Sequence, residues 1–445
     1  MKSTEISNDG TVKTRVHLPE LKNTIFKPFY GWFIVGIGFL SIFVGVGTTI
    51  DALAVLVKPM SENLGWTRTS VMGAYTLGAV ASALVSPFAG RYIDRYGARI
   101  LMPVSAFFAG GLLMAISAVT SHWQFYLIFG LGLGIARPCF SMVSAVTTVS
   151  NWFILKRGRA LAVTTMGAAI SALVIIPFSQ FIVTNINWRA TWVMLGLMAW
   201  IFLAVPSAIF IRRRPEDMGL LPDGGLVEES RKKKIPNSDV GKTEELSGIE
   251  VHWTTKEAMQ TPAFWFVLVS QILTTFAVMG VWLHMLASFT DRGISPGQAA
   301  LAMGSISITS MPSRIAWGLI AEKYDLRLCT IISYIGLATS FIIIMIADTF
   351  VIAISGILLN GLFFGGVIVL QTMVWPAYYG RLALGSIQGY TELFRVIGFA
   401  GGPLLAGIIY DLTGSYYTVF TSFTLGCLIA TMFMYLAKPP IGKIS

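Results

Sequence analysis

The chain has 445 residues, of which 55% are hydrophobic and only 12% are charged, with a formal net charge of +10 at pH 7. A soluble domain carries roughly 25% charged residues, so this composition excludes an ordinary soluble enzyme or binding domain and indicates a polytopic membrane protein. Cytoplasmic loops of membrane proteins are rich in Lys and Arg, so the basic excess does not call for nucleic acid as a partner.

The first half of the chain is a polar tail followed by six apolar stretches. Residues 1–29 lack the charged, apolar and small-residue blocks of a cleaved signal peptide, so we expect a cytoplasmic tail. About 20 apolar residues are enough to cross ~30 Å of hydrocarbon. We predict spans over 30–57, 67–89, 98–120, 123–150, 159–184 and 188–211. They predict an N-terminal six-helix bundle over residues 30–211.

A polar segment separates this bundle from the next one. Residues 212–261 are rich in charged residues, Pro and Gly, which predicts a cytoplasmic linker. Near its end, Thr254 and Glu257 have the Thr-x-x-Glu spacing of a capping box. This spacing predicts a short interfacial helix that leads into the seventh span.

Six further spans follow, and the two halves of the chain repeat each other. We predict spans over 262–290, 297–320, 328–347, 350–376, 385–409 and 415–437, which form a C-terminal bundle over 262–437 before a cytoplasmic tail at 438–445. The stretch "GRYIDRYGAR" at 90–99 aligns with "GLIAEKYDLR" at 318–327. Such repeats are typical of transporters whose substrate site lies between the halves near the bilayer midplane. The predicted fold is therefore an all-α membrane protein with twelve transmembrane helices in two pseudo-symmetric six-helix bundles.

The distribution of basic residues predicts the orientation. The chain has 32 Lys and Arg residues. The loops on the side opposite the termini hold only Lys58, Arg68, Arg189 and Arg292. Three more lie within spans, and all others fall on the side that holds both termini. The positive-inside rule therefore places both termini in the cytoplasm, with the chain in the cell (inner) membrane.

The loop over residues 90–99 carries a recognisable pattern. It resembles the Gly-x-x-x-Asp-Arg-x-Gly-x-Arg loop between spans two and three of the major facilitator superfamily, matched here by Gly90, Asp94, Arg95, Gly97 and Arg99. Glycines permit a tight turn, and Asp94 is suited to hold a basic group or to cap a helix of the facing half, which would close a cytoplasmic gate. The other interpretation is a solvated basic loop that only follows the topology rule.

Within that superfamily, four stretches are similar to monocarboxylate porters and bacterial oxalate:formate antiporters. They are "YGWFIVGIGF" at 30–39, "WFILKRGRALAVTTMGAA" at 152–169, "RRPEDMGLLPDG" at 213–224 and "HMLASFTDRGISPGQAA" at 284–300. The resemblance implies that Arg314 in span eight binds a carboxylate. The porters have an aspartate four residues earlier, where this chain has Ser310. The antiporters pair the arginine with a lysine in span eleven, near Arg395, which implies a substrate with two acidic groups.

Charged residues inside the spans lead to the same kind of substrate. The predicted spans contain three arginines, Arg137, Arg314 and Arg395, but only two acids, Asp51 and Glu392. One cation is left unmatched, and a substrate carboxylate would complete the set through two parallel hydrogen bonds to a guanidinium. Each arginine also has a structural interpretation. Arg314 would snorkel to the interface, Arg395 would pair with Glu392 three positions back, and Arg137 would pair with Asp51 or a backbone carbonyl.

Further polar residues within the spans are weaker candidates. Glu392 and Asp51 are candidates for proton coupling, because each is a carboxyl group inside a span. The remaining candidate substrate ligands are His284, Tyr390, Asn360 and Gln371. Polar contacts between helices explain Tyr390, Asn360 and Gln371 about as well. His284 could also join proton coupling, or be a satisfied polar residue near the outer mouth.

The predicted function is secondary active transport of small organic anions, either mono- or dicarboxylates, by alternating access. Proton-coupled symport and anion exchange both fit. The expected partners are the carboxylate, protons or a counter-anion, and the lipid bilayer, with no cofactor, metal or nucleic acid and a monomeric chain. A multidrug or cation exporter of the same fold would need more acids in its cavity, and a transporter-like sensor would signal through the linker. The four histidines are scattered and no nucleophile–base set is recognised, so an enzyme is not expected.

Overall fold

The computed structural model describes residues 3–6, 12–15, 29–224 and 253–440, which fall into two compact units, Met1–Tyr30 and Gly31–Ser445. The smaller unit contains an antiparallel hairpin of β1 (Ser3–Ile6) and β2 (Val12–Arg15). Only a polar tail was predicted for this part of the chain. The rest of that tail before residue 29, the linker over 225–252 and the C-terminal residues 441–445 lie outside the described residues.

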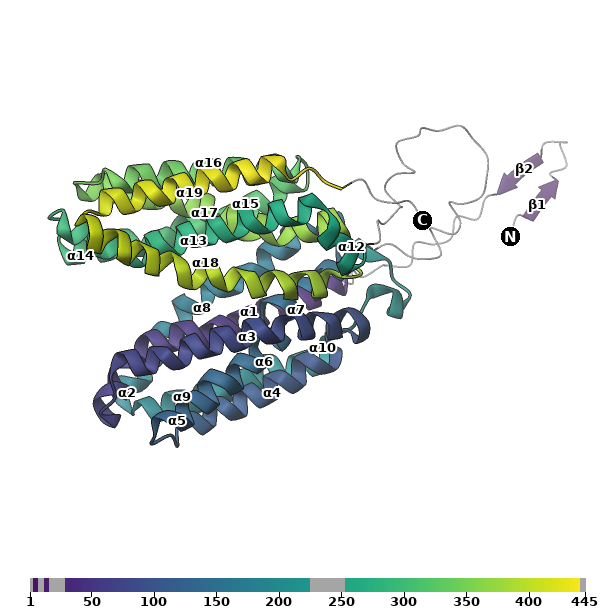
Figure 1. Cartoon of the computed structure of the whole chain (residues 1–445). Helices are drawn as coiled ribbons and strands as arrows, with labels where there is room; N and C mark the ends of the chain where they lie inside the picture. Colours follow the sequence, from purple (N-terminus) through teal and green to yellow (C-terminus); the bar gives the residue numbers. More distant parts are fainter. Residues whose placement is uncertain (1–2, 7–11, 16–28, 225–252, 441–445) are drawn as a thin grey trace. The chain divides into compact units, whose positions relative to one another are not determined.

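The first half of the larger unit consists of long helical rods, some of them built from consecutive segments (Figure 1). The rods are α1 (Gly31–Val46) with the π-helix η1 (Gly47–Asp51) and α2 (Ala52–Leu64); α3 (Arg68–Tyr96); α4 (Ala98–Ile116); α5 (His122–Phe125) with the π-helix η2 (Tyr126–Gly132), α6 (Leu133–Phe140) and α7 (Met142–Trp152); α8 (Arg157–Asn185); and α9 (Trp188–Ala199) with the π-helix η3 (Trp200–Ala204) and α10 (Val205–Phe210). Each span predicted for the N-terminal half overlaps one of these rods.

The second half follows two 3-10 turns and a short helix. The turns are η4 (Pro215–Met218) and η5 (Pro222–Gly224), and the short helix is α12 (Thr255–Gln260). Thr254 and Glu257 form the predicted capping box at the start of α12. The helices that follow are α13 (Pro262–Asp291), α14 (Pro296–Gly304), α15 (Ile306–Ala321), α16 (Leu326–Met345), α17 (Phe350–Tyr379), α18 (Leu384–Thr413) and α19 (Tyr416–Leu436).

The span predicted over 297–320 is broken in the middle. Among the described residues, 11 helical stretches are long and apolar enough to cross a membrane, and this span is not one of them. It is split at Ser305 into α14 and α15, of 9 and 16 residues, and neither reaches the ~20 residues that a span requires. Gly304, a poor helix former, stands at the break. With the two pieces taken together, all twelve predicted spans are present, and the all-α class is confirmed for the larger unit.

Capping side chains fix where many of the rods begin. In each case a side-chain oxygen accepts a hydrogen bond from the backbone N–H three residues later, which satisfies one of the free donors at a helix N-terminus. These caps are Thr67 of α3, Asn187 of α9, Thr261 of α13, Ser295 of α14, Asp325 of α16 and Thr349 of α17. The span starts predicted from the apolar stretches lie within a few residues of these caps.

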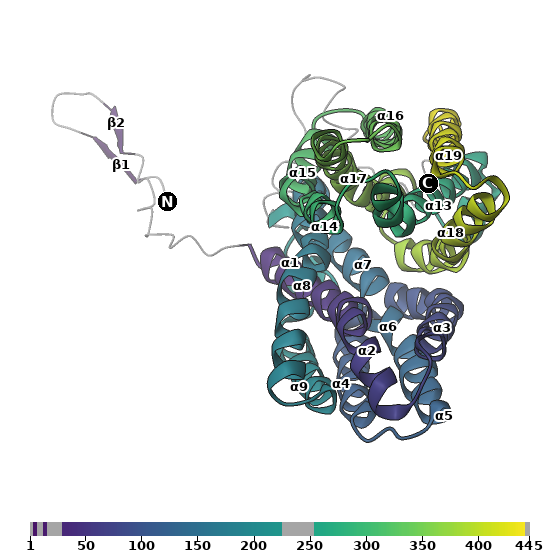
Figure 2. The same ribbon diagram turned by 90° about the vertical axis from the view of Figure 1, so that its left-hand side faces the viewer.

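Buried apolar side chains form two large cores, one in each half. The first core draws on buried residues between Ile37 and Ile211, and the second on buried residues between Ala258 and Ala437. Each group of helices therefore encloses its own core, as two bundles do. Across the boundary, α3 packs against α18 and α8 packs against α15, and Figure 2 shows the two bundles in a view along the rods.

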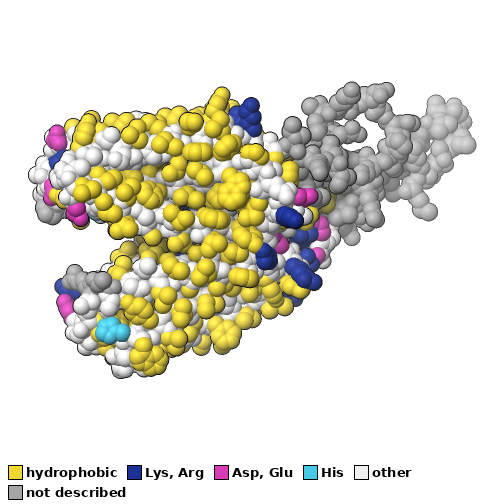
Figure 3. Space-filling model, in the orientation of Figure 1, with side chains coloured by type: hydrophobic (Ala, Val, Ile, Leu, Met, Phe, Trp, Pro, Cys, Tyr) yellow, Lys and Arg dark blue, Asp and Glu magenta, His cyan; other side chains and the backbone are white. Residues whose placement is uncertain are grey.

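The two ends of the larger unit differ. We call the end where α10 stops and α12 begins the linker end, and the end with α2, α5 and α14 the far end (Figure 1). Figure 3 shows a cleft between the halves that opens at the far end, whereas the halves touch at the linker end. Apolar side chains cover the flanks in Figure 3, as a surface in contact with lipid requires.

Candidate functional site

A cavity of about 320 Å³ lies at the base of the cleft, between the two halves. Its walls come from α1, η1, α3, α6, α7 and α8 on one side and from α13, α17 and α18 on the other. The charged and polar residues that line it are Thr49, Ser82, Ser86, Arg137, Ser141 and Thr165 from the first half and Gln271, Thr274, Thr275, Gln371, Thr372, Gln388, Thr391, Glu392 and Arg395 from the second. The predicted candidates that line the cavity are therefore Arg137, Gln371, Glu392 and Arg395.

Arg137 stands at a break in its helical rod. Pro138 follows it in α6, and the helix ends at Phe140 before Ser141 leaves helical geometry at φ −92° and ψ −134°. The Ser41 hydroxyl of α1 donates a hydrogen bond to the Phe140 carbonyl at this break. Within the described residues, no hydrogen bond or ion pair engages the Arg137 guanidinium. The first half thus presents a free cation to the cavity.

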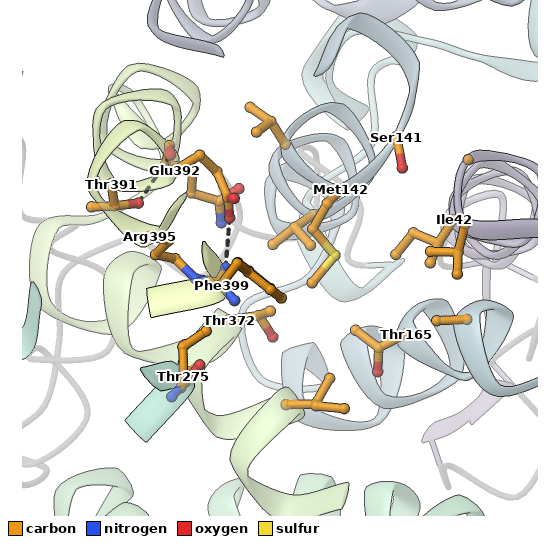
Figure 4. A pocket seen from close by; sticks show the side chains of 18 of the residues that line it. Ile42, Ser141, Met142, Thr165, Thr275, Thr372, Thr391, Glu392, Arg395 and Phe399 are labelled. Atoms are coloured by element: carbon orange, nitrogen blue, oxygen red, sulfur yellow. Dashed lines mark hydrogen bonds and ion pairs between the residues drawn. The ribbon is translucent and has the colours of Figure 1, made fainter. Parts of the chain in front are cut away.

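Arg395 lies on the opposite wall and already has an anionic partner. Its Nη1 is 2.5 Å from Oε1 of Glu392, one turn earlier on α18. The guanidinium also lies over the ring of Phe399, 5.7 Å from the ring centroid. Figure 4 shows these three side chains on one wall, facing Ser141 and Met142 on the other. The Nε of Arg395 has no hydrogen-bond partner among the described residues.

A network of amide groups stiffens the wall of the second half. Gln271 donates to the backbone carbonyl of Gln371 at 3.1 Å and accepts from Trp375 Nε1 at 3.3 Å. Gln371 donates through Nε2 to the Tyr334 hydroxyl at 3.1 Å. Bonds of this kind fix buried polar groups in one orientation. The wall therefore presents Gln371 to the cavity in a set position.

Arg314 is not among the residues that line the cavity. It is buried on α15, and its Nη1 donates to the backbone carbonyl of Thr165 on α8, across the boundary between the halves. Its Nε has no hydrogen-bond partner among the described residues. Thr165 itself lines the cavity, so Arg314 lies directly behind the wall. If Arg314 extended to the membrane interface, its side chain would be exposed, but it is buried.

The other polar candidates are engaged outside the cavity lining. Asp51 is buried in η1 and accepts a hydrogen bond from the Ser171 hydroxyl of α8, so it does not pair with Arg137. His284 contacts the Pro403 carbonyl at 3.3 Å, and Asn360 donates to the Ser340 hydroxyl at 2.9 Å. These contacts join neighbouring helices, as the alternative interpretation of such residues proposed.

At the linker end, the pattern of residues 90–99 closes the gap between the halves. The carboxylate of Asp94 accepts hydrogen bonds from the backbone N–H groups of Gly385 and Ser386, both at 2.7 Å, at the start of α18. Of the two roles considered for Asp94, the structure shows the helix cap, where an anion meets the positive end of the helix dipole. A Cβ on Gly90 would lie 1.9 Å from the Gly385 carbonyl oxygen, so only glycine permits this approach.

The remaining residues of this pattern shape the turn between α3 and α4 or stay exposed. Gly97 has a φ of +79°, which L side chains rarely adopt. Arg95 lies over the ring of Tyr96, and Arg99 is exposed. The hydroxyl of Tyr390, another candidate ligand, accepts a hydrogen bond from Arg91. Tyr390 therefore joins α18 to α3 at the linker end.

The repeated loop of the second half makes the same closure with the roles of the halves exchanged. Glu322 occupies the position of Asp94 in the repeat, and it accepts from the backbone N–H of Arg159 at 2.8 Å, near the start of α8. It also forms an ion pair of 2.8 Å with the Arg159 guanidinium. Gly318, the counterpart of Gly90, also approaches a facing glycine closely, since a Cβ on it would lie 2.7 Å from the Gly158 carbonyl oxygen. The sequence repeat is therefore a structural repeat.

Two amides were missed as candidates. Gln271 and Gln388 line the cavity, and Gln388 also accepts from the Thr147 hydroxyl of the other half at 3.4 Å. Both are polar residues inside apolar spans, the same signal that singled out Gln371. A consistent search for amides within spans would have found them.

Comparisons with known proteins agree with this geometry. The profile of the Major Facilitator Superfamily matches residues 35–292 and again residues 265–444. Monocarboxylate transporter 2 of Rattus norvegicus is 22% identical over 408 residues, which cover 87% of this chain and 78% of that protein. The oxalate:formate antiporter of Oxalobacter formigenes is 22% identical over 273 residues, which cover 60% of this chain and 57% of that protein.

Solved structures share the fold at low sequence identity. The transporter FucP in its outward conformation has a TM-score of 0.66 at 12% identity, covering 92% of this chain and 99% of that one. The human organic anion transporter MFSD10 has a TM-score of 0.63 at 14% identity, covering 91% and 99%. The matched family is one of transporters, as expected from the sequence, and not of enzymes. The chain is a multi-pass membrane transporter that belongs to the Major Facilitator Superfamily.

Proposed function

We propose that this protein is a secondary transporter of small organic anions whose preferred substrate is a monovalent carboxylate. The cavity lies between two bundles that close on each other at one end and separate at the other, as alternating access requires. The similar proteins include a monocarboxylate transporter and an oxalate:formate antiporter, so organic anions are the substrates that their names specify.

The observation that carries this proposal is the charge balance of the cavity wall. Among the residues that the structure describes, the charged side chains that line the cavity are Arg137, Arg395 and Glu392. Glu392 neutralises Arg395 at 2.5 Å, while Asp51, the other acid of the spans, bonds Ser171. A single positive charge on Arg137 is left for the substrate, and one carboxylate matches it. A cation exporter would face net repulsion in this cavity.

The rest of the lining favours an anion with an apolar body. Apolar side chains come from both halves and include Val46, Met142, Phe364 and Trp375. Each methylene group moved from water to such a wall contributes about 0.8 kcal/mol. We therefore propose that the carboxylate binds Arg137 while the remainder of the substrate packs against these side chains.

Arg314 would join the site in other conformations of the cycle. Arg314 does not line the cavity, but it donates a hydrogen bond to the backbone carbonyl of Thr165, which does. Thr165 belongs to the opposite half. Movement of the halves relative to each other must alter that hydrogen bond. The carboxylate-binding role that the family resemblance implies for Arg314 would then follow opening at the linker end.

We place the linker end in the cytoplasm, because the basic residues of the chain gather there (Figure 3). The conformation described here would then be open to the outside of the cell. Both chain termini would lie on the inner side of the membrane. Labelling of cysteines placed at Lys58 and Lys323 from outside intact cells tests this orientation, since only the first should react.

Two kinds of coupling are compatible with the Glu392–Arg395 pair. If Glu392 takes up a proton, Arg395 becomes available and the carboxylate and the proton are carried together. If Glu392 stays charged, the cavity changes sides only with an anion on Arg137, and transport is exchange. Uptake into vesicles with and without a pH gradient separates these alternatives, because only symport follows the gradient.

The experiment that tests the function is uptake of a labelled monocarboxylate into liposomes containing the purified protein. The wild type should accumulate the label, and Arg137→Gln should reduce uptake to near the background of empty liposomes at low substrate concentration. Lys323→Gln is the matched control, because it removes a positive charge from an exposed side chain outside the cavity.

If the wild type carries no organic anion in this assay, the assignment of the substrate class is wrong. If Arg137→Gln transports as well as Lys323→Gln, the free cation on Arg137 does not bind the substrate.

A further inference from the structure

The segment that follows α10 contacts both halves at the linker end and has no role in the cavity. It covers residues 212–224 and includes the turns η4 and η5. Its sequence, "RRRPEDMGLLPDG", contains the stretch noted for family resemblance. The described part of the segment leaves the first half at Phe210 and ends at Gly224, before the undescribed part of the linker.

Asp223 anchors this segment to the first half. Its carboxylate accepts hydrogen bonds from three consecutive backbone N–H groups, those of Ile154 at 2.9 Å, Leu155 at 2.8 Å and Lys156 at 3.0 Å. These donors lie in the turn between α7 and α8, next to the positive end of the α8 dipole. Asp223 has a φ of +62°, the left-handed conformation that Asp tolerates better than most side chains. The anchor is thus a charged side chain held by several donors.

Glu216 ties the same segment to the second half. Its Oε1 lies 2.5 Å from Nη2 of Arg381, in the turn between α17 and α18. The other terminal nitrogen of Arg381, Nη1, donates to the backbone carbonyl of Asn151 on α7 at 2.9 Å. One guanidinium of the second half is therefore held by the first half directly and by the segment.

The segment also touches the turn that carries the family pattern. The Trp152 indole N–H donates to the Arg212 carbonyl at 3.4 Å. A Cβ on Gly97 would lie 2.7 Å from the side chain of Arg213, so the segment lies closely over the turn between α3 and α4. Its path links three turns of the linker end: α3–α4, α7–α8 and α17–α18.

We infer that residues 212–224 act as a strap that holds the linker end shut and sets the balance between the two access states. Opening of this end moves the turn between α17 and α18 away from the first half. Because Asp223 fixes the strap to the first half, that movement breaks the bond between Glu216 and Arg381. The strap therefore favours the conformation that is open at the far end, whichever anion is carried.

The strap predicts graded effects of its two contacts. Asp223→Asn removes the negative charge that accepts hydrogen bonds from three N–H groups, and hydrogen bonds to charged groups are stronger than those between neutral groups. The ratio of linker-end-open to linker-end-closed molecules should therefore rise on the order of tenfold. The pair of Glu216 and Arg381 is partly exposed, with side-chain accessibilities of 38% and 11%, so Glu216→Gln should raise the same ratio roughly two- to fivefold.

The test measures distances between spin labels on the full-length protein in lipid nanodiscs without substrate. Labels replace Tyr96 and Tyr324, exposed residues of the two halves at the linker end, after the three native cysteines have been changed to alanine. A second pair, at Trp123 and Leu301, reports on the far end. Asp217→Asn is the matched control, because this exposed neighbour of Glu216 forms no hydrogen bond or ion pair with the described residues.

Both strap variants should enrich the long distance at the linker end and the short distance at the far end, while Asp217→Asn matches the wild type. In the double variant the change in the ratio of open to closed molecules should be smaller than the two single changes combined. Loss of the Asp223 anchor already frees Glu216, so its substitution has less left to change. The inference is overturned if either Asp223→Asn or Glu216→Gln keeps the wild-type distance distribution. Glu216→Gln changes only a partly exposed side chain, so the test does not depend on whether Asp223→Asn folds.

Because no substrate is present in these measurements, they are independent of the proposed transport of anions. A failure to transport carboxylates would leave the result on the strap intact. An unchanged distance distribution would likewise leave the proposed substrate untouched.

Discussion

Each wall of the cavity carries an arginine, but within the described part of the chain only one of the two arginines is paired with an acid. On the wall of the first half, Arg137 faces the cavity without a partner among the described residues, whereas on the other wall Arg395 is bound to Glu392 at 2.5 Å. Both arginines lie near the middle of their helical rods, so depth in the membrane does not separate them. A count of arginines thus overstates the negative charge that the cavity accepts, because only an unpaired one is available to a substrate.

The largest effect should come from removal of the free cation. Arg137→Gln should weaken binding of monocarboxylates about 10- to 100-fold, since charge-assisted hydrogen bonds contribute roughly 1.5–3 kcal/mol. Thermal stabilisation of the purified protein by increasing concentrations of the anion measures this loss. Arg137→Lys should recover only part of the affinity, because an ammonium lacks the two parallel donors of the guanidinium. Full binding by Arg137→Gln would remove the distinction between the two walls.

The next effect concerns the apolar part of the substrate. Phe364 lines the cavity on α17 and packs against Trp282, with ring centroids 5.5 Å apart. Phe364→Ala should weaken binding of hexanoate about fivefold, from the roughly 1 kcal/mol of lost apolar contact, and leave acetate within twofold. Titration of both anions checks this, and an equal loss for the two would place the apolar body elsewhere.

A smaller effect is expected on the wall where the cation is already paired. Arg395→Gln should reduce affinity for monocarboxylates only about two- to fivefold, because the variant removes a charge that Glu392 already neutralises. The same thermal titration as for Arg137→Gln provides the comparison. If Arg395→Gln loses as much affinity as Arg137→Gln, the Glu392 pair opens on binding and the substrate uses both walls.

The smallest effect is expected for Asp51. Its carboxylate accepts from Ser171 and is separate from Arg137, so Asp51→Asn should change the affinity for anions less than twofold. The asparagine oxygen still accepts the hydrogen bond from Ser171. A marked gain in affinity would mean that Asp51 competes with the substrate for Arg137 in another conformation.

Much of the fold was readable because its signals are local. Apolar runs predict the spans, and the Thr-x-x-Glu spacing of Thr254 and Glu257 predicts the start of α12. The sequence repeat that aligns Asp94 with Glu322 predicts two halves. Both carboxylates accept hydrogen bonds from backbone N–H groups near the start of a helix in the facing half. The alternative that paired Arg395 with Glu392 was also local, because residues three apart share a helix face.

The rest of the site depends on packing between distant segments. Nothing near Asp51 in the sequence shows that Ser171, on another helix, takes its carboxylate. Arg314 faces Thr165 across the boundary of the halves, a contact 149 residues apart in the chain. Asp223 belongs to a stretch that the resemblance had marked, but its three partners lie in a turn near residue 155. Composition and spacing thus identified polar and charged residues within the spans, but not which of them contact each other.

If the cavity of the wild type accepts one negative charge, it should distinguish between two anions of equal chain length that differ in charge. Binding of butyrate and succinate is measured by titration at pH 7.5 to the wild type and to Glu392→Gln. The wild type should prefer butyrate, and Glu392→Gln should bind succinate on the order of tenfold more tightly than the wild type, because Arg395 is released for a second carboxylate. A wild type that prefers succinate, with Glu392→Gln unchanged, would contradict a cavity that accepts one charge.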